Sequence, residues 1–588
     1  GCCIDGFCDI LTEAECMEFG GKYAGNDQDC VDCVEETCDQ LWIQANGGNL
    51  STAANWNPAQ APKDEGDGCK NLFLNLAGEY SVTMGTNAAN ALFVRNGNVA
   101  LSGTRLALSG RPGGRSGSGP LPPALGIGNG GTLFLSGGEI VADTAVIGDI
   151  DASGSSTSSR ITVSGNGARL NVTDDIVIGG ETDGTLTVTD FGRVNSGNAV
   201  VGSLEVVNSV GSDVTVRNGA EWTNDNLTVG SFSPGVVTLR DNGVMLSNGA
   251  TLGVNTNVEG EVRVVDKDSS WRVAGNAIIG EDGVGSLNIE DLGVVSVDSM
   301  TIGATEGGSG SVIVRGATTI LERSSLNVEE GDLTLGSGGT GTLALLEGGS
   351  LRTVGDFVVG VSGTLASFVV DGAQNDVTSG MAIAGHLRVG AGSDVAQAAF
   401  DNGGTGAAGT ATIGDGAPGQ LVISNSGRFA TMSNEDETQF GILTVGNNAA
   451  GTVVVESGGE LQADGVLLGA GGTGVGTLTL SNAMVVTTRL GITVGNGGNS
   501  ASMTVEGAST VRSDSIFFIG ASGGKSTVTL AGETPESPAQ LIVSDLLGIG
   551  ILATESSLIL TRNATVTAGE IVVGGLAPGL LAILENSV

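Results

Sequence analysis

A short apolar tetrad that ends in glycine recurs along most of this chain, and it constrains the fold more than any other feature. Examples are Ala145–Gly148, Ile176–Gly179, Ala277–Gly280 and Ile571–Gly574. Eighteen such glycines lie between Gly128 and Gly574, at a mean spacing of about 26 residues. A period of this size is typical of solenoids, in which each repeat is one structural unit that packs on its neighbours.

The residues between two tetrads predict short strands. A glycine-rich turn is followed by a strand such as Thr185–Val188, a second turn and another short strand, so each repeat supplies three strands. Asn-Gly pairs at 96–97, 218–219, 242–243, 248–249 and 402–403 are expected to supply the positive φ that the corners need. We therefore predict an all-β protein, a right-handed parallel β-helix of about 18–20 coils with three strands per coil.

The repeat spacing alternates between short and long. From Gly179 the intervals run 23, 28, 23, 27, 23 and 33 residues, so the repeating unit is two coils of about 53 residues together. This alternation predicts that longer loops recur on every second coil. Apolar residues inside each coil are expected to pack on the coils above and below, so isolated coils would not fold.

All the cysteines lie near the N-terminus and predict a local disulfide cluster. No cysteine follows residue 69, and an even number in a short loop-rich stretch fits an oxidising compartment. The Cys30-x2-Cys33 pair has no second such pair and no nearby histidine to complete a zinc site. The pairing stays open, and the residues expected to form disulfides are Cys2, Cys3, Cys8, Cys16, Cys30, Cys33, Cys38 and Cys69.

These features predict three segments. Residues 1–40 form a disulfide-rich head, residues 41–90 form a capping segment to which Cys69 is tied unless it pairs with the head, and residues 91–588 form the β-helix rod. No polar cap follows Leu580, Leu581, Ile583 and Leu584, so we expect an open β-edge there. Such an edge invites head-to-tail contact with the N-terminal head of another subunit; truncation of a longer chain is the rival explanation.

Charge and hydropathy exclude several partners. The formal net charge of −40 would repel nucleic acid and anionic lipid, and no run of 18 apolar residues is present to span a membrane. Solubility explains the acidity best. Calcium is kept as a candidate ligand of the acidic clusters Asp64–Asp67 and Asn434–Glu437, although solvated loops are the preferred interpretation. No other cofactor is expected.

Catalytic signatures are sparse. The single histidine, His386, occupies a position that ordinary residues fill in other coils, which favours a turn or surface role. Asp174-Asp175 is the sole match to the signatures of polygalacturonase-like enzymes and is explained by an exposed turn. Two dinucleotide-binding patterns, Gly336–Gly341 and Gly469–Gly474, are each followed by a strand where a nucleotide-binding fold needs a helix. We predict no enzyme and no catalytic residue.

The repeats resemble those of autotransporter passengers and of PEP-CTERM-associated surface proteins. There a "VG-x-x-G-x-G-T-L-T-V-x-x-G-G" phrase alternates with a "G-S-x-W" phrase. Here Val445-Gly446 leads through Gly451–Val455 to Gly458-Gly459, and Trp222 and Trp271 lie before Gly230 and Gly280 as in the tryptophan phrase. Trp42, Asn55–Asn57 and Pro62 look like the segment that opens those passengers. The resemblance covers roughly residues 40–588.

The head looks like the cysteine-rich segment of secreted planctomycete proteins, with Cys2-Cys3, Cys8, Cys16, Gly20-Gly21 and Tyr23 in the shared pattern. Autotransporters end in a membrane barrel that has no counterpart here. This difference favours a resemblance to the PEP-CTERM-associated proteins over one to autotransporters. Both resemblances imply a bacterial protein that is secreted and stays outside the cell or on its surface.

The resulting expectation is a structural extracellular protein, a surface or filament subunit that self-associates into a homopolymer. The alternative is an adhesin that binds a glycan or another cell-surface ligand through an elaborated loop, for which 111–123 is the best candidate. A polysaccharide-active β-helix enzyme is the third and least favoured function.

Overall fold

The structure is a computed structural model. It describes residues 39–588 except 63–69, 111–122, 149–156, 204–210, 320, 363–364, 373–376, 393–395, 434–438, 498–499, 523 and 554, and before residue 39 only the backbone of three short strands. The chain divides into two compact units, one made of residues 1–226 and 232–234 and the other of residues 227–231 and 235–588. The boundaries predicted at residues 40 and 90 stay predictions.

The first unit consists of short strands and one 3-10 helix, Ala53–Asn55. Its strands are β1 (Cys2–Ile4), β2 (Phe7–Asp9), β3 (Lys22–Tyr23), β4 (Asp39–Trp42), β5 (Gly48–Asn49), β6 (Trp56–Asn57), β7 (Asn71–Leu74), β8 (Gly78–Ala89), β9 (Ala91–Arg95), β10 (Gly97–Leu108), β11 (Leu125–Gly128), β12 (Thr132–Leu135), β13 (Gly138–Ala142), β14 (Ala145–Ile147), β15 (Ser159–Ser164), β16 (Ala168–Ile178), β17 (Gly184–Thr189), β18 (Arg193–Val201), β19 (Ser212–Val216) and β20 (Glu221–Val229), whose last residues belong to the second unit.

The second unit consists of strands joined by turns. They are β21 (Gly235–Leu239), β22 (Val244–Leu252), β23 (Glu259–Val265), β24 (Ser270–Ile279), β25 (Val284–Glu290), β26 (Val294–Ile302), β27 (Ser309–Arg315), β28 (Ser325–Val328), β29 (Leu333–Leu335), β30 (Thr340–Leu346), β31 (Ser350–Thr353), β32 (Phe357–Val359), β33 (Ala366–Asp371), β34 (Gly380–Val389), β35 (Ala396–Asp401), β36 (Thr405–Ile413), β37 (Gly419–Ile423), β38 (Arg428–Thr431), β39 (Ile442–Val445), β40 (Gly451–Glu456), β41 (Glu460–Leu468), β42 (Gly476–Ser481), β43 (Met484–Asn496), β44 (Ala501–Glu506), β45 (Thr510–Ser513), β46 (Phe517–Ser522), β47 (Ser526–Ala531), β48 (Gln540–Ile549), β49 (Ser556–Thr561), β50 (Thr565–Val573) and β51 (Gly579–Ile583).

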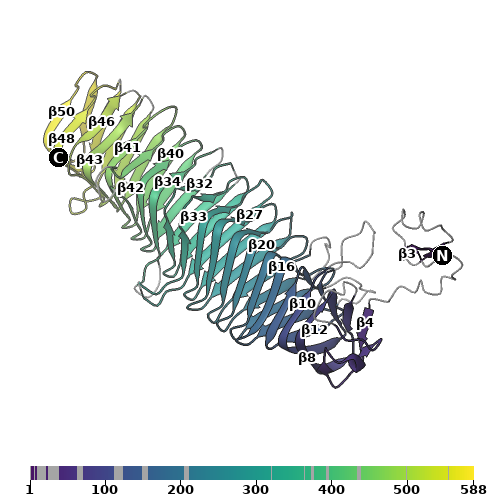
Figure 1. Cartoon of the computed structure of the whole chain (residues 1–588). Coiled ribbons are helices and arrows are strands. Elements are labelled where there is room, and N and C mark those ends of the chain that lie inside the picture. The colour runs from purple at the N-terminus through teal and green to yellow at the C-terminus, as the bar shows by residue number, and fades with distance from the viewer. Residues whose placement is uncertain are drawn as a thin grey trace. The chain divides into compact units, whose positions relative to one another are not determined.

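Both units are parallel β-helices, as predicted. In one coil of the second unit, β27, β28 and β29 follow one another along the chain, and each pairs in parallel with the corresponding strand of the next coil, β30, β31 or β32 (Figure 1). In other coils the second and third strands merge into one long strand with a register shift at the bend, as in β24. Three strand segments per coil are thus confirmed, and the handedness of the coil stays a prediction.

The core of each unit is a set of apolar columns that run from coil to coil. In the first unit one column lies on the first strand of each coil and consists of Val82, Leu101, Leu135, Val163, Val188 and Val216. In the second unit another column on the first strand of each coil consists of Val262, Leu287, Val312, Leu343, Phe368, Ala398, Leu421, Val453, Leu478, Met503, Val528, Leu558 and Leu581. All except Leu581 are fully or almost fully buried.

At the N-terminal end of the first unit, residues 39–62 form hydrogen bonds with the outer edge of the first coil. Strand β8 pairs with β10 on one edge and with β5 on the other, and the Leu50 amide donates to the Thr83 carbonyl at 3.1 Å. The rings of Trp42 and Trp56 meet edge to face at 5.0 Å, and the Trp56 indole donates to the Leu50 carbonyl at 2.9 Å. These described residues occupy a strand edge that would otherwise be open.

The alternation of short and long repeats is visible in the second unit as excursions on four coils. They are residues 316–324 after β27, 372–379 after β33, 432–441 after β38 and 532–539 after β47. Three follow the first strand of their coil, whereas residues 432–441 follow the second strand. The first three excursions thus recur on every second coil as predicted, but among the described residues the coil of β42 and β43 has none where the next one is expected. The corner at which the chain leaves the coil is also not constant.

Glycines that end the tetrads turn the corner that follows the third strand. Gly280, Gly303 and Gly446 have φ of 75°, 70° and 70°, a left-handed conformation that costs glycine little. A Cβ on Gly280 would lie 2.3 Å from the Ser309 carbonyl oxygen of the next coil, so the close approach of coils also requires glycine there. One predicted corner is wrong: Asn248-Gly249 lies inside β22, at a bend with no positive φ, because the chain shifts register there instead of turning.

Candidate functional site

His386 lies in the bend of β34, where the register shifts between Ile383 and His386, and its side chain is half-buried. Its ring Nε2 lies 2.9 Å from the Thr412 hydroxyl, its Nδ1 contacts the Thr410 hydroxyl, and its backbone amide donates to Asp356 Oδ1 at 2.9 Å. Burial lowers the pKa of His386, although the nearby Asp356 carboxylate opposes this shift. The side chain thus lies at a surface bend, and its ring contacts two hydroxyls of the next coil.

An ion pair joins the same strand to the turn that follows β36. The Arg388 guanidinium donates to Asp415 Oδ2, and the Asn447 amide donates to Asp415 Oδ1 at 2.9 Å. Burial alone would raise the pKa of Asp415, but the hydrogen bonds from Arg388 and Asn447 outweigh it and lower this pKa. The carboxylate is therefore ionised and saturated with donors, which makes it a poor general acid or base.

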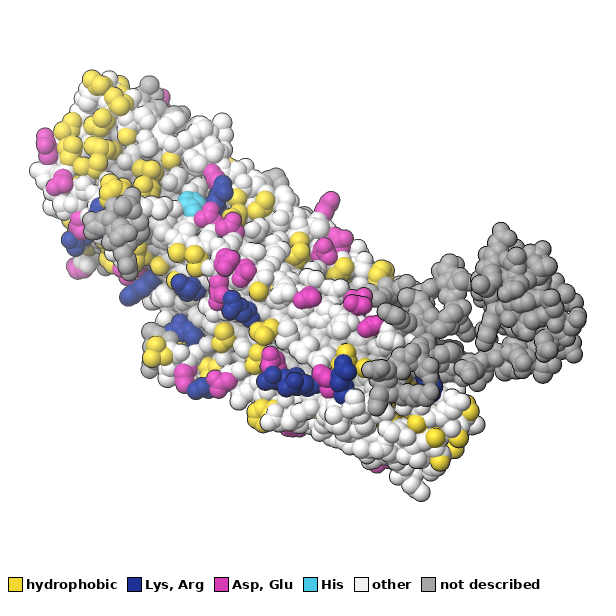
Figure 2. Space-filling model, in the orientation of Figure 1, with side chains coloured by type: hydrophobic (Ala, Val, Ile, Leu, Met, Phe, Trp, Pro, Cys, Tyr) yellow, Lys and Arg dark blue, Asp and Glu magenta, His cyan; other side chains and the backbone are white. Residues whose placement is uncertain are grey.

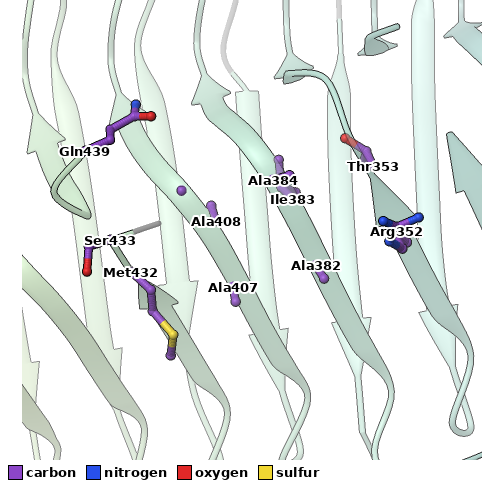
Figure 3. Close-up of a pocket in the computed structure, with 11 residues that line it drawn as sticks. Arg352, Thr353, Ala382, Ile383, Ala384, Ala407, Ala408, Met432, Ser433 and Gln439 are labelled. Carbon is purple, nitrogen blue, oxygen red and sulfur yellow. The ribbon is translucent and has the colours of Figure 1, made fainter. Parts of the chain in front are cut away.

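A shallow groove of about 330 Å³ crosses the outward face of β31, β34 and β36 (Figure 3). Its floor is made of small side chains, Ala382, Ala384 and Ala407, and Arg352 and Met432 stand at its two sides. Among the described residues that line it there is no carboxylate, histidine or cysteine. The groove offers a largely apolar surface and no group for proton transfer.

One side of this groove belongs to the excursion 432–441, whose base is fixed by a buried carboxylate. Asp464 Oδ2 accepts from the Ser433 amide at 3.0 Å and the Gly441 amide at 2.9 Å, and Asp464 Oδ1 accepts from the Thr488 hydroxyl at 3.0 Å. Sequence reasoning missed Asp464. This residue belongs to the coil that follows the excursion, and nothing in the sequence indicates which carboxylate of that coil binds it.

Other candidate motifs are explained by the coils. Asp174 and Asp175 are exposed at the bend of β16, and Asp175 accepts from the Asn198 amide at 2.9 Å. Strands β30 and β42 follow the two dinucleotide-like patterns, as predicted. Within the described part of the chain no group of three or more His, Cys, Asp and Glu side chains is placed to hold a metal ion. The acidic clusters at 64–67 and 434–437 lie outside the described residues.

The tryptophans of the second repeat phrase point into the core. Trp222 and Trp271 are fully buried, and their indole nitrogens donate to the hydroxyls of Ser196 and Ser247 at 3.3 and 3.2 Å. Each indole thus packs inside its own unit and satisfies its polar atom on the preceding coil. These residues stabilise the stack and are not available to a ligand.

The cysteine assignments lie outside what the structure describes. The backbone of β1 pairs with β2 and β3 in an antiparallel sheet, in which Cys3 is opposite Cys8. The side chains of Cys2, Cys3 and Cys8, and residues Cys16, Cys30, Cys33, Cys38 and Cys69 as a whole, are not described, so the disulfides stay a prediction. The loop candidate 111–123 likewise lies outside the described residues apart from Pro123.

The last coil exposes apolar side chains at the C-terminal end of the second unit (Figure 2). Ile571 and Val573 continue the columns of Leu547 and Ile549, which are fully buried, yet they are 46% and 42% exposed. Among the predicted interface residues, Leu581 and Ile583 continue the inward columns of Leu558 and Leu560, and Leu580 lies opposite Ser557 in an outward column. Leu584 is also exposed.

The fold defines the class of this chain, a parallel β-helix protein. No family model matches it. It is similar to the protein named uncharacterized lipoprotein YdeK of Escherichia coli (strain K12), with 28% identity over 260 residues. This match covers 42% of the chain and 18% of the length of that protein. In the described part of the chain, no helix is long and apolar enough to cross a membrane.

Proposed function

We propose that this chain is a structural component of a bacterial cell surface, in which the stacked coils are themselves the functional element. The observation that carries the proposal is the unbroken inward column of the second unit, which continues from Val262 to Leu558 without an interior polar residue. Such a stack gains stability with every added coil and holds its outward residues at a fixed spacing. We also propose that the chain has no enzymatic activity, since the described groove has no acid or base.

An extracellular or envelope location is part of this proposal. The similarity to a protein named a lipoprotein supports it, since lipid attachment holds a protein at a membrane surface. The cysteines confined to the first 69 residues also support it, because disulfides persist in oxidising compartments. Fractionation of the native organism, with antibodies against the β-helix, tests the location: recovery only from the cytoplasm contradicts it.

We propose that copies of the chain associate end to end through the last coil. The apolar side chains of Ile571, Val573 and Ile583 lie in columns that are buried in every earlier coil. Among the described residues the outer edge of β51 has no strand partner, and that of β50 is met only by Val588. Covering these side chains with the N-terminal head of a second copy would remove apolar surface from water and pair open backbone groups.

The test is sedimentation velocity and electron microscopy of the purified chain over a range of concentrations. We expect a mass that rises with concentration and particles that join end to end. Ile583→Lys should abolish this association because it places a charge in the inward column. Thr567→Lys is the matched control, since Thr567 is exposed in an outward column of the same coil, and it should associate like the wild type. A wild-type chain that stays monomeric at high concentration contradicts end-to-end assembly.

An adhesin is the second candidate function, favoured by the excursion that Asp464 anchors beside the groove of Figure 3. An anchored loop next to an apolar floor is a suitable surface for a cell-surface ligand. Binding of the purified chain to whole cells tests it, with Asp464→Ala as the variant that releases the loop. Equal binding by the wild type and this variant contradicts a role of the loop.

A further inference from the structure

A second surface depression lies in the first unit, on the outward face of the first strands of four successive coils. It is lined by side chains or backbone of β8, β10, β12 and β15 and encloses about 640 Å³. The register places Ser81, Ala100, Phe134 and Thr162 in one outward column. In coils beyond this depression the same column continues with Thr187 and Thr215. Phe134 is therefore an aromatic side chain in a column of small side chains, most of them hydroxyls.

The neighbouring outward column carries the polar groups of the depression. Glu79, Asn98, Thr132 and Arg160 are in register on consecutive coils, so adjacent members are about 4.8 Å apart. Phe134 is 39% exposed, and the small side chains of Ser81 and Ala100 leave space beside its ring. The depression thus combines an accessible aromatic face with a row of hydrogen-bonding side chains.

The two charged side chains of this row are unpaired within the described part of the chain. Arg105 and Arg193, in the same unit, lie 3.2 Å from Glu139 and 3.7 Å from Glu221. Arg160 and Glu79 are both exposed and have no hydrogen bond or ion pair with another described residue. Arg160 and Glu79 are therefore free to form hydrogen bonds with a ligand at the depression.

We propose that this depression binds a segment of an uncharged saccharide chain. A sugar ring has an apolar face that packs on an aromatic ring such as Phe134, and its hydroxyls both donate and accept hydrogen bonds. Glu79 accepts, Arg160 donates and Asn98 does both, so the row matches a polyhydroxylated ligand. A polyanion fits less well, because Glu79 cancels the charge of Arg160 and the chain as a whole carries −40.

This inference does not depend on end-to-end assembly, because the depression and the last coil involve different strands. The test uses the full chain and isothermal titration with a panel of uncharged oligosaccharides, namely hexamers of β-1,4-glucose, β-1,3-glucose, α-1,4-glucose and N-acetylglucosamine, with polygalacturonate as the charged probe. We expect at least one uncharged hexamer to bind. Phe134→Ala and Arg160→Ala should each weaken that binding about tenfold, the loss of one stacking or one charge-assisted contact.

Phe232→Ala is the matched control, since Phe232 is also an exposed phenylalanine, 40% accessible, and lies outside the depression. It should bind like the wild type, and circular dichroism should show that all three variants keep the β spectrum. Three outcomes overturn the proposal: no hexamer binds, Phe134→Ala binds as tightly as the wild type, or polygalacturonate binds more tightly than every uncharged hexamer. Each of these results leaves the assembly proposal untouched.

Discussion

At the scale of single residues, backbone conformation at the corners explains much of the composition. In several coils two successive residues with positive φ form the turn between the first and second strands, as in Asp241-Asn242 and Asn425-Ser426. Asn, Asp and Gly tolerate this left-handed region best, whereas other side chains crowd the following carbonyl. Phe191 and Leu292, with φ of 66° and 76°, are the large apolar exceptions.

Phe191→Asn should stabilise the first unit. The Phe191 side chain is 63% exposed, so its removal loses little buried area, and asparagine relieves a left-handed conformation that costs about 1 kcal/mol. The midpoint of urea unfolding should therefore rise with an unchanged slope. Phe191→Val is the control and should lower the midpoint, since a β-branched residue is still less tolerant of positive φ. A lower midpoint for the asparagine variant would show that the ring contributes more than the strain costs.

His386 should make the second unit less stable in mild acid. Burial lowers the pKa of His386 below its ordinary value of 6.5, so the unfolded chain binds a proton at a higher pH than the folded chain does. The stability due to the neutral ring is thus present above about pH 6.5 and is lost as the pH falls below it. The urea midpoint between pH 8 and pH 5 should fall more for the wild type than for His386→Gln. Identical pH profiles would contradict this.

At the scale of strands, packing between successive coils depends on the size of the inward side chains. Phe368 meets Phe357 and Phe400 with ring centroids 5.0 and 6.0 Å apart, and Phe400 meets Phe429 at 5.1 Å. Edge-to-face contacts of this kind add to the free energy of burial. Four coils of the second unit are therefore linked by one aromatic cluster.

Phe368→Ala should lower the free energy of unfolding by about 3–5 kcal/mol, because it leaves a cavity inside a stack that cannot collapse without moving whole coils. Ser367→Ala is the control: its side chain is outward, and its effect should stay within about 0.5 kcal/mol. Amide hydrogen exchange should report the loss most strongly in β30, β33 and β35. Equal destabilisation by the two variants would contradict a core role for the aromatic cluster.

At the scale of the molecule, each unit is a stack in which a coil interacts with its two neighbours. The second unit therefore tolerates removal of a whole coil if the ladder stays in register. Ala501 of β44 pairs with Ser526 of β47, and Gly476 of β42 pairs with Ala501. Residues 501–525 thus form one complete coil, because Ala501 and Ser526 occupy the same position on successive coils.

Deletion of residues 501–525 should leave a folded chain, because Ser526 then takes the place of Ala501 opposite Gly476. Deletion of 501–512 alone is the control and should prevent the C-terminal coils from folding, since residues 513–525 are too few to complete a coil between β42 and β47. Circular dichroism and limited proteolysis distinguish the two variants. A whole-coil deletion as protease-sensitive as the control would contradict nearest-neighbour stacking.

The sequence by itself determined the class of fold, the period, the strands and most corners, because these depend on local physics: alternating apolar residues bury one face, and glycine adopts positive φ. It also predicted the excursions on the coils that begin with β27, β33 and β37, but not their absence from the coil that begins with β42. It did not predict that Asn248-Gly249 lies within a strand, that His386 is half-buried, or that Asp464 anchors residues 432–441. Only the tertiary structure decided these points and placed Phe134 beside Arg160, because excursions of variable length leave the stack without disturbing its register. Residues a whole coil apart in the chain therefore become neighbours at separations that no local pattern encodes.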